Sequence, residues 1–245
     1  MRHNRFMINS SPRFWAIVPA AGVGKRFSAD IPKQFHQLNG QLVAQHTLSR
    51  LLSLSIIDAI YSPCDQSSAY WSKVPAASDQ RVCLIAGGDN RAQSVLNGLI
   101  AMQEFAAESD WVLVHDMARP CVTCENIGQL IAALVGHPVG GILAATINDT
   151  LKVIDTEKHI HETANRSLYR AAQTPQMFRY GLLKNAIQTM LEDNKIPTDE
   201  ASAVEYCGHK ALVVEGRQDN IKITKREDLA IAAAIIKNQE IEGCV

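Results

Sequence analysis

WAIVPAAGVGKR, residues 15–26, is the stretch that decides the fold, because an unbroken apolar run leads directly into small residues and then two cations. Four consecutive apolar residues are typical of a strand covered on both faces, and such strands occur in mostly parallel sheets. Small residues such as Gly22 and Gly24 let backbone N–H groups approach an anion closely. The stretch therefore predicts a strand followed by a candidate phosphate-binding loop, although a plain strand-to-helix turn has the same composition.

The loop matches neither of two well-known glycine motifs. The spacing of a P-loop is absent, and Phe27 and Ser28 stand where a dinucleotide-binding fingerprint needs its third glycine. An anion site is nevertheless favoured, because Lys25 and Arg26 end the loop and Lys33, within Pro32-Lys33-Gln34, follows shortly after.

Similar apolar runs alternate with helical patterns along the chain. The runs lie at 56–61, 82–86, 111–115, 141–145 and 211–214. Apolar residues at helical spacing follow at 95–106 and 127–135, and a last helix is expected to open with a capping box at 224–227. This alternation predicts an α/β fold, a three-layer Rossmann-like architecture with a mostly parallel sheet and right-handed crossovers. Ligands bind such folds beyond the carboxyl ends of the strands.

The 245 residues fit one domain, expected at 14–239 between an N-terminal tail, 1–13, and a C-terminal tail, 240–245. One region departs from the alternation. Short alternating pieces flank a polar turn at about 148–173, which predicts a β-hairpin arm that leaves the main sheet. Arms of this kind often pack against a second subunit.

Composition excludes several classes of protein. The chain carries 24 basic and 25 acidic side chains, so it lacks the standing positive field of a dedicated nucleic-acid or membrane-surface binder. No apolar run has the length of a signal peptide or a membrane span, so a cytoplasmic protein with six reduced cysteines is expected. Cys121-Val122-Thr123-Cys124 leaves a redox site as an alternative.

Two further clusters follow apolar runs. Gly87-Gly88-Asp89-Asn90 comes after the run at 82–86 and opens a helix, where it can face an anion or simply cap the helix. Asp116 and Arg119 come after the run at 111–115, where a carboxylate is costly unless it meets a metal, a cation or a ligand. Asp116 is a candidate Mg²⁺ ligand, with an Asp116–Arg119 ion pair as the alternative, and His115 is expected to be structural.

Three downstream pieces complete the set of candidates. Arg166 lies in the hairpin region, and Lys222, in Asp219-Asn220-Ile221-Lys222, follows the run at 211–214. Thr198-Asp199-Glu200 is expected to begin a helix with Thr198 as its N-cap, and a bound phosphate could share that helix end.

Taken together, these motifs resemble the 2-C-methyl-D-erythritol 4-phosphate cytidylyltransferase family of the non-mevalonate isoprenoid pathway. The resemblance runs from about residue 15 to residue 236. It rests on the order of several motifs, PAAGVGKR at 19–26, PKQ at 32–34, GGD at 87–89, HD at 115–116 with RP at 119–120, DT at 149–150, TPQ at 174–176, TDEAS at 198–202 and DNIK at 219–222.

The resemblance implies a role for each matching residue. Arg26 and Lys33 would stabilise the triphosphate charge, and Arg166 and Lys222 would position the acceptor phosphate. The nucleotide, with cytosine selected by the loop at 88–94, would be held by Ala20, Ala21, Gly22, Gly24, Gly88, Asp89 and Ser94. The acceptor pocket and the metal, Mg²⁺, would involve Asp116, Arg119, Thr150, Thr174, Thr198 and Asp219. A homodimer is also implied, in which Thr150 and Arg166 on the arm complete the partner's site.

The implied reaction moves CMP from CTP to a polyol phosphate, with release of pyrophosphate. An acceptor phosphate is already ionised near neutral pH, so catalysis would rest on positioning and electrostatics rather than on a general base. Met117 and the pair Ile147-Asn148 depart from the residues usual in the family. Rival interpretations are a cytidylyltransferase for ribitol 5-phosphate and a non-catalytic nucleotide-binding protein.

Overall fold

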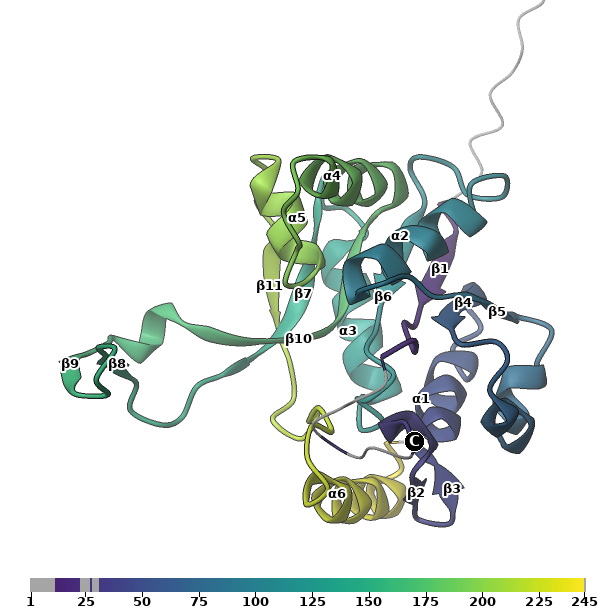
Figure 1. Ribbon diagram of the computed structural model, residues 1–245, viewed down its shortest axis with the longest axis horizontal. Helices are drawn as coiled ribbons and strands as arrows, with labels where there is room; N and C mark the ends of the chain where they lie inside the picture. The colour runs from purple at the N-terminus through teal and green to yellow at the C-terminus, as the bar shows by residue number, and fades with distance from the viewer. Residues whose placement is uncertain (1–11, 23–26, 28–30, 245) are drawn as a thin grey trace, which may run out of the picture.

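The computed structural model describes residues 12–22, 27 and 31–244. Within these residues, seven strands form the main sheet in the order β11-β7-β10-β6-β1-β4-β5 (Figure 1). Every pairing in this sheet is parallel except those of β10, which runs antiparallel to both β6 and β7. The strands are β1 (Phe14–Ile17), β4 (Ile57–Cys64), β5 (Val82–Ala86), β6 (Trp111–Val114), β7 (Gly140–Thr146), β10 (Arg170–Arg179) and β11 (Leu212–Glu215).

Helices cover both faces of this sheet. They are α1 (Val43–Leu52), α2 (Arg91–Ala101), α3 (Cys124–Leu134), α4 (Tyr180–Glu192), α5 (Glu200–Tyr206) and α6 (Asp228–Glu242). Short 3₁₀ helices are η1 (Lys33–Phe35), η2 (Ala69–Lys73), η3 (Pro75–Ser78) and η4 (Arg166–Leu168). No helix among the described residues is both long enough and apolar enough to span a bilayer.

Strand β1 shows why its apolar run is unbroken. Ala16 and Val18 belong to the core cluster that contains Leu48 of α1 and Ile127 of α3. Trp15 and Ile17 belong to the opposite cluster, which contains residues of α2, α4 and α5. Successive side chains of a strand point to opposite faces, so a strand between two helical layers must be apolar at every position. The predicted α/β fold with a mostly parallel sheet is confirmed.

A third, smaller core lies beside the main sheet. Helix α6 buries Ala232 and Ile236 against Leu38 of the hairpin formed by β2 (Gln37–Leu38) and β3 (Gln41–Leu42). Ile223, in the segment that leads into α6, is buried in the same cluster. This packing brings the C-terminal part of the chain back to the loops that follow β1.

The predicted hairpin arm is present between β7 and β10. Strands β8 (Lys152–Ile154) and β9 (Ile160–Thr163) form a separate antiparallel pair that stands away from the body of the molecule (Figure 1). Every residue of both strands is exposed in the single chain.

The structure corrects several expected boundaries. Helix α2 ends at Ala101, before the predicted Met102 and Ala106, and α3 ends at Leu134. The capping box predicted at 224–227 is wrong, because α6 begins at Asp228, whose own carboxylate accepts from the Thr224 and Lys225 N–H groups. Helix α6 also continues to Glu242, past the expected boundary at 239.

The predicted N-cap of the helix at 199–200 is off by one residue. Asp199, not Thr198, caps α5, because its side chain accepts from the Ser202 N–H while the Ser202 hydroxyl accepts from the Asp199 N–H. The two residues form a capping box at the start of α5.

Strand β10 has no counterpart among the predicted runs. Its sequence contains Pro175, and a proline normally argues against a central strand. The ladder with β7 shifts register between Ala172 and Gln176, so Pro175 is left out of the pairing.

Candidate active site

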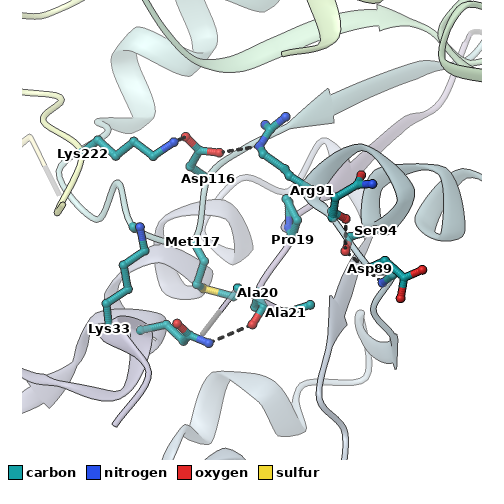
Figure 2. A pocket seen from close by; sticks show the side chains of 15 residues that line it. Pro19, Ala20, Ala21, Lys33, Asp89, Arg91, Ser94, Asp116, Met117 and Lys222 are labelled. Atoms are coloured by element: carbon teal, nitrogen blue, oxygen red, sulfur yellow. Dashed lines mark hydrogen bonds and ion pairs between the residues drawn. The ribbon is translucent and has the colours of Figure 1, made fainter. Parts of the chain in front are cut away.

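Three loops at the carboxyl ends of the parallel strands meet around a cavity of about 200 Å³ (Figure 2). One follows β1, one follows β5, and one follows β6. Because parallel strands all end at the same edge, residues far apart in sequence are brought together there. The lining residues are Pro19, Ala20, Ala21, Gly22, Lys33, Gln34, Gly88, Asp89, Asn90, Arg91, Ser94, Asp116, Met117, Ala118 and Lys222.

The loops after β1 and β5 pack directly against one another. A Cβ added to Gly87 would lie 2.3 Å from the Ala21 Cβ, so only glycine allows this approach. Gln34 Nε2 donates to the Ala20 carbonyl at 2.8 Å and holds the first loop from the other side. The small residues are therefore needed for the packing of the two loops, in addition to any role in binding a ligand.

The loop at 88–94 is organised by its own side chains. Asn90 caps α2 by accepting from the Gln93 N–H at 2.9 Å, so the capping role considered for this cluster is observed. The Gly88 N–H donates to Ser94 Oγ at 3.0 Å, and that hydroxyl donates to the Asn90 carbonyl at 2.9 Å. Gly88 and Ser94 thus shape the wall of the cavity through a contact with each other.

Asp116 forms the electrostatic centre of the site. Its Oδ1 lies 3.1 Å from Arg91 Nε, and its Oδ2 lies 2.8 Å from Lys222 Nζ and 3.6 Å from Arg119 Nε. Burial by itself would raise the pKa of this carboxyl, but the charges of Arg91, Lys222 and Arg119 outweigh it and hold the pKa well below its ordinary value. Asp116 is therefore ionised throughout the neutral range.

Arg91 and Glu200 are a pair that the sequence did not reveal. Arg91 Nη1 lies 2.7 Å from Glu200 Oε1 and Nη2 lies 3.1 Å from Oε2, a bidentate contact to a carboxylate that is 2 % exposed. Both residues stand within motifs noted above, but their partnership joins α2 to α5 across 109 positions. Only the packing of these two helix ends could reveal it.

A second cavity, of about 190 Å³, adjoins the first and shares Arg91, Asp116 and Lys222 with it. Its other lining residues are Arg119, Ala172, Gln173, Thr174, Gln176, Thr198 and Asp199. Strand β10 and the start of α5 supply most of this wall. The unpredicted strand is therefore the one that builds the second cavity.

Most of the predicted site residues gather at these two cavities. The first is lined by Ala20, Ala21, Gly22, Lys33, Gly88, Asp89, Ser94, Asp116 and Lys222, and the second by Asp116, Arg119, Thr174, Thr198 and Lys222. Arg26 and Gly24 lie outside the described residues. Figure 2 shows Lys33 and Lys222 along one side of the first cavity, with Asp89 and Ser94 on the other.

Three predicted residues lie elsewhere in the single chain. Thr150 and Arg166 belong to the arm, where the Arg166 guanidinium donates to the Asn148 carbonyl, and neither lines a cavity described above. Asp219 lines neither cavity, and its carboxylate accepts from Arg217 at 2.8 and 2.9 Å and from Gln239 at 3.1 Å. Its contacts lie within the segment that leads to α6 rather than in the acceptor cavity.

The surroundings of Asp116 do not suit the metal role predicted for it. Both carboxylate oxygens already face cations, and these positive charges oppose a divalent cation at the same oxygens. No cluster of three or more His, Cys, Asp or Glu side chains that could hold a metal occurs among the described residues. The ion pair with Arg119, the alternative considered from sequence, is part of the observed arrangement.

The Cys121–Cys124 pair does not have the properties of a redox site. Burial raises the pKa of the Cys121 thiol to about 12, so the reactive thiolate is absent near neutral pH. The Cys124 thiol contacts the Ser53 hydroxyl and the Arg50 carbonyl. Both cysteines are free thiols that pack between α1, α3 and α6.

Fold and site together define a nucleotide-binding α/β protein of the nucleotidyltransferase class, with small-residue loops and several cations where the parallel strands end. The family model described as 2-C-methyl-D-erythritol 4-phosphate cytidylyltransferase matches residues 14–238. The chain belongs to this family.

Individual relatives agree with this assignment. A 2-C-methyl-D-erythritol 4-phosphate cytidylyltransferase of Pseudomonas putida (strain KT2440) is 45 % identical over 224 residues, covering 91 % of this chain and 95 % of that protein. One of Ectopseudomonas mendocina is 47 % identical over 221 residues, covering 90 % and 94 %. The crystal structure of the Francisella tularensis enzyme superposes with a TM-score of 0.78 at 34 % identity, covering 91 % of this chain and 99 % of that one.

Proposed function

We propose that this protein transfers CMP from CTP to 2-C-methyl-D-erythritol 4-phosphate, giving 4-diphosphocytidyl-2-C-methyl-D-erythritol and pyrophosphate in isoprenoid precursor biosynthesis. The observation that carries the proposal is the pair of adjoining cavities that share Arg91, Asp116 and Lys222. CTP would occupy the first cavity and the polyol phosphate the second, so the α-phosphorus and the attacking oxygen would meet at the shared residues. Family membership supports both substrates.

The chemistry requires two polyanions to approach one another. An oxygen of the acceptor phosphate attacks the α-phosphorus in line, and the bond to the bridging oxygen breaks, so that pyrophosphate leaves with the electron pair. The attacking oxygen is already ionised, so no side chain has to remove a proton. The protein's contribution is to position both phosphates and to offset their charges.

Lys33 and Lys222 are the described lysines best placed for this task. Lys33 begins η1 and its Nζ donates to the Ile223 carbonyl at 3.2 Å, which anchors the ammonium beside the segment that carries Lys222. Lys222 is paired with Asp116 but remains 39 % exposed, so its ammonium is open to a phosphate as well. Arg119 supplies a further cation from the second cavity.

Magnesium remains part of the proposal, with a different binding mode from the one predicted. Mg²⁺ prefers phosphate oxygens and water together with few protein ligands, so the triphosphate itself is the suitable carrier. The ion would supply additional positive charge to the phosphates when bound. Asp116, with its cation partners, would instead orient Lys222 and the arginines.

A homodimer and a cytoplasmic location are also proposed. The arm exposes apolar side chains that a partner subunit would cover, including Ile154, Ile160 and Leu168. Thr150 and Arg166 lie on this arm rather than at their own chain's cavities, as a role in the partner's site requires.

The proposed activity is tested by pyrophosphate release. We expect release with CTP and 2-C-methyl-D-erythritol 4-phosphate, and far less when ATP, GTP or UTP replaces CTP. Ribitol 5-phosphate is the matched acceptor, because it offers the same phosphate on a different polyol. Faster turnover with ribitol 5-phosphate, or no release with any acceptor, would contradict the proposal.

A further inference from the structure

We propose that His115 is a positioning residue whose neutral imidazole holds the Thr174 hydroxyl so that this hydroxyl can only accept a hydrogen bond from the acceptor substrate. The inference rests on the proposed function and extends it to the orientation of the acceptor. His115 lines neither cavity, so it acts through Thr174, Asp116 and Arg119.

Both ring nitrogens of His115 have a hydrogen-bond partner within the protein. The residue directly follows β6 and its side chain is fully buried. The ring Nε2 lies 3.0 Å from the Arg119 carbonyl oxygen, and Nδ1 lies 3.0 Å from Thr174 Oγ1. The Asp116 N–H donates to the same Thr174 oxygen at 3.0 Å.

The proton positions follow by elimination. A carbonyl oxygen can only accept, so Nε2 must carry the proton that it shares with Arg119. Burial lowers the pKa of His115 to about 4, so the ring is neutral near pH 7 and Nδ1 has no proton. Nδ1 therefore accepts, and the Thr174 hydroxyl must donate its only proton to it.

This arrangement limits what Thr174 can bind. A hydroxyl oxygen has one proton and two lone pairs. The proton is committed to His115, and one lone pair accepts from the Asp116 N–H. A ligand group that bonds to the remaining lone pair must be a donor, which describes a polyol hydroxyl and excludes an ionised phosphate oxygen.

The consequence is a defined direction for the acceptor in the second cavity. Its hydroxyl end faces Thr174, while its phosphate faces Lys222 and Arg119, two of the three cations that line the same cavity among the described residues. The same imidazole ties the Arg119 carbonyl, and through Thr174 the Asp116 N–H, to strand β10. The buried imidazole thus fixes the position of the loop after β6 relative to β10, the strand that lines the second cavity.

Two substitutions at His115 separate positioning from bulk packing. His115→Asn places an amide at the level of Nδ1 and can still accept from Thr174, whereas His115→Gln reaches the level of Nε2 and cannot. We expect His115→Gln to raise the KM for the acceptor about tenfold with less than about a twofold change in the KM for CTP, because one hydrogen bond to the acceptor is lost. His115→Asn should restore most of the acceptor affinity. Equal effects of both variants on both KM values would overturn the proposal.

An acceptor analogue provides an independent measurement. For the wild-type protein, a deoxy acceptor that lacks the hydroxyl bound by Thr174 should bind about tenfold more weakly than the natural acceptor. For Thr174→Val, the deoxy acceptor and the natural acceptor should bind equally well. If every singly deoxygenated acceptor keeps this tenfold discrimination in Thr174→Val, the assignment of Thr174 as the hydroxyl reader is wrong.

The tautomer itself is observable in the unmodified protein. Long-range ¹H–¹⁵N NMR of the histidine rings at pH 7 should show His115 neutral with the proton on Nε2. An imidazolium, or a proton on Nδ1, would overturn the proposal without any variant having to fold. Because this experiment uses no substrate, its result stands apart from the pyrophosphate-release assay that tests the proposed function.

Discussion

At the scale of single residues, the site depends on one carboxylate that organises cations from three parts of the chain. Asp116 contacts Arg91, Arg119 and Lys222, and Arg91 contacts Glu200 in turn. Three cations against two carboxylates leave a net positive charge where two phosphorylated substrates are proposed to meet. Because the pairs are partly buried, water screens this charge less than it would on an open surface.

Lys222→Ala should lower kcat/KM about a hundredfold, because one preorganised charge on the phosphates is lost. Steady-state kinetics with CTP and the acceptor measure the effect. Lys225→Ala is the matched control, since Lys225 lies three residues further on and its side chain is 72 % exposed beside Glu227. Equal losses in the two variants, or none in Lys222→Ala, would contradict the role given to Lys222.

Arg91→Ala should reduce the free energy of unfolding by about 3 kcal/mol, because it leaves the buried Glu200 without its bidentate partner. Urea denaturation measures the change. Glu227→Ala, which breaks the exposed pair with Lys225, should cost less than about 1 kcal/mol. If Arg91→Ala is as mild as this control, the Arg91–Glu200 pair does not stabilise the contact between α2 and α5.

At the scale of elements, the start of α5 couples helix capping to the acceptor cavity. Asp199 caps this helix, and its other carboxylate oxygen accepts from Gln176 Nε2 of β10 at 2.9 Å. Gln176 Oε1 in turn accepts from the Ala201 N–H at 2.9 Å. The first turn of α5 is thereby attached to the strand that carries Thr174.

Asp199→Ala should reduce stability by about 1 kcal/mol through the lost cap, whereas Thr198→Ala should change it by less than about half that amount. Thermal and urea unfolding of both variants provide the comparison. The opposite ranking would favour the capping residue expected from sequence over the one observed.

The strands also show which elements can be predicted from sequence patterns and which cannot. The apolar runs that became β1, β6 and β7 are recognisable because a strand buried on both faces has no room for polar positions. The run that became β11 is equally apolar, although this edge strand is mostly exposed. Strand β10 was missed because Gln173, Thr174 and Pro175 interrupt its pattern. Gln173 and Thr174 line a cavity, and Pro175 lies within the register shift, so neither the apolar requirement nor the backbone ladder applies to these positions.

At the scale of the whole molecule, the arm is a large exposed extension with no core of its own. Two short strands do not form a stable unit in water, and the apolar side chains Ile154, Ile160 and Leu168 on this arm are exposed in the single chain. This exposure supports the proposed homodimer.

Leu168→Asp should weaken the dimer and lower activity together, because Leu168 is 80 % exposed next to Arg166 on the arm. Light scattering coupled to gel filtration, across a dilution series, measures the mass. Phe105→Asp is the control, since Phe105 is 61 % exposed but belongs to the loop after α2. A monomeric wild-type protein with full activity would contradict the proposed exchange of arms.

The sequence by itself determined the α/β architecture, the hairpin arm and many of the residues that line the two cavities, because these depend on local periodicity and on loops that directly follow strands. Tertiary structure alone decided that Arg91 joins Glu200, that Asp219 pairs with Arg217 and Gln239, and that Asp116 pairs with Arg91, Arg119 and Lys222. Those outcomes depend on which side chains meet across long separations, and local patterns carry no information about such distances. The sequence shows that Asp116 is a charged residue, but only the folded structure determines which side chains pair with it.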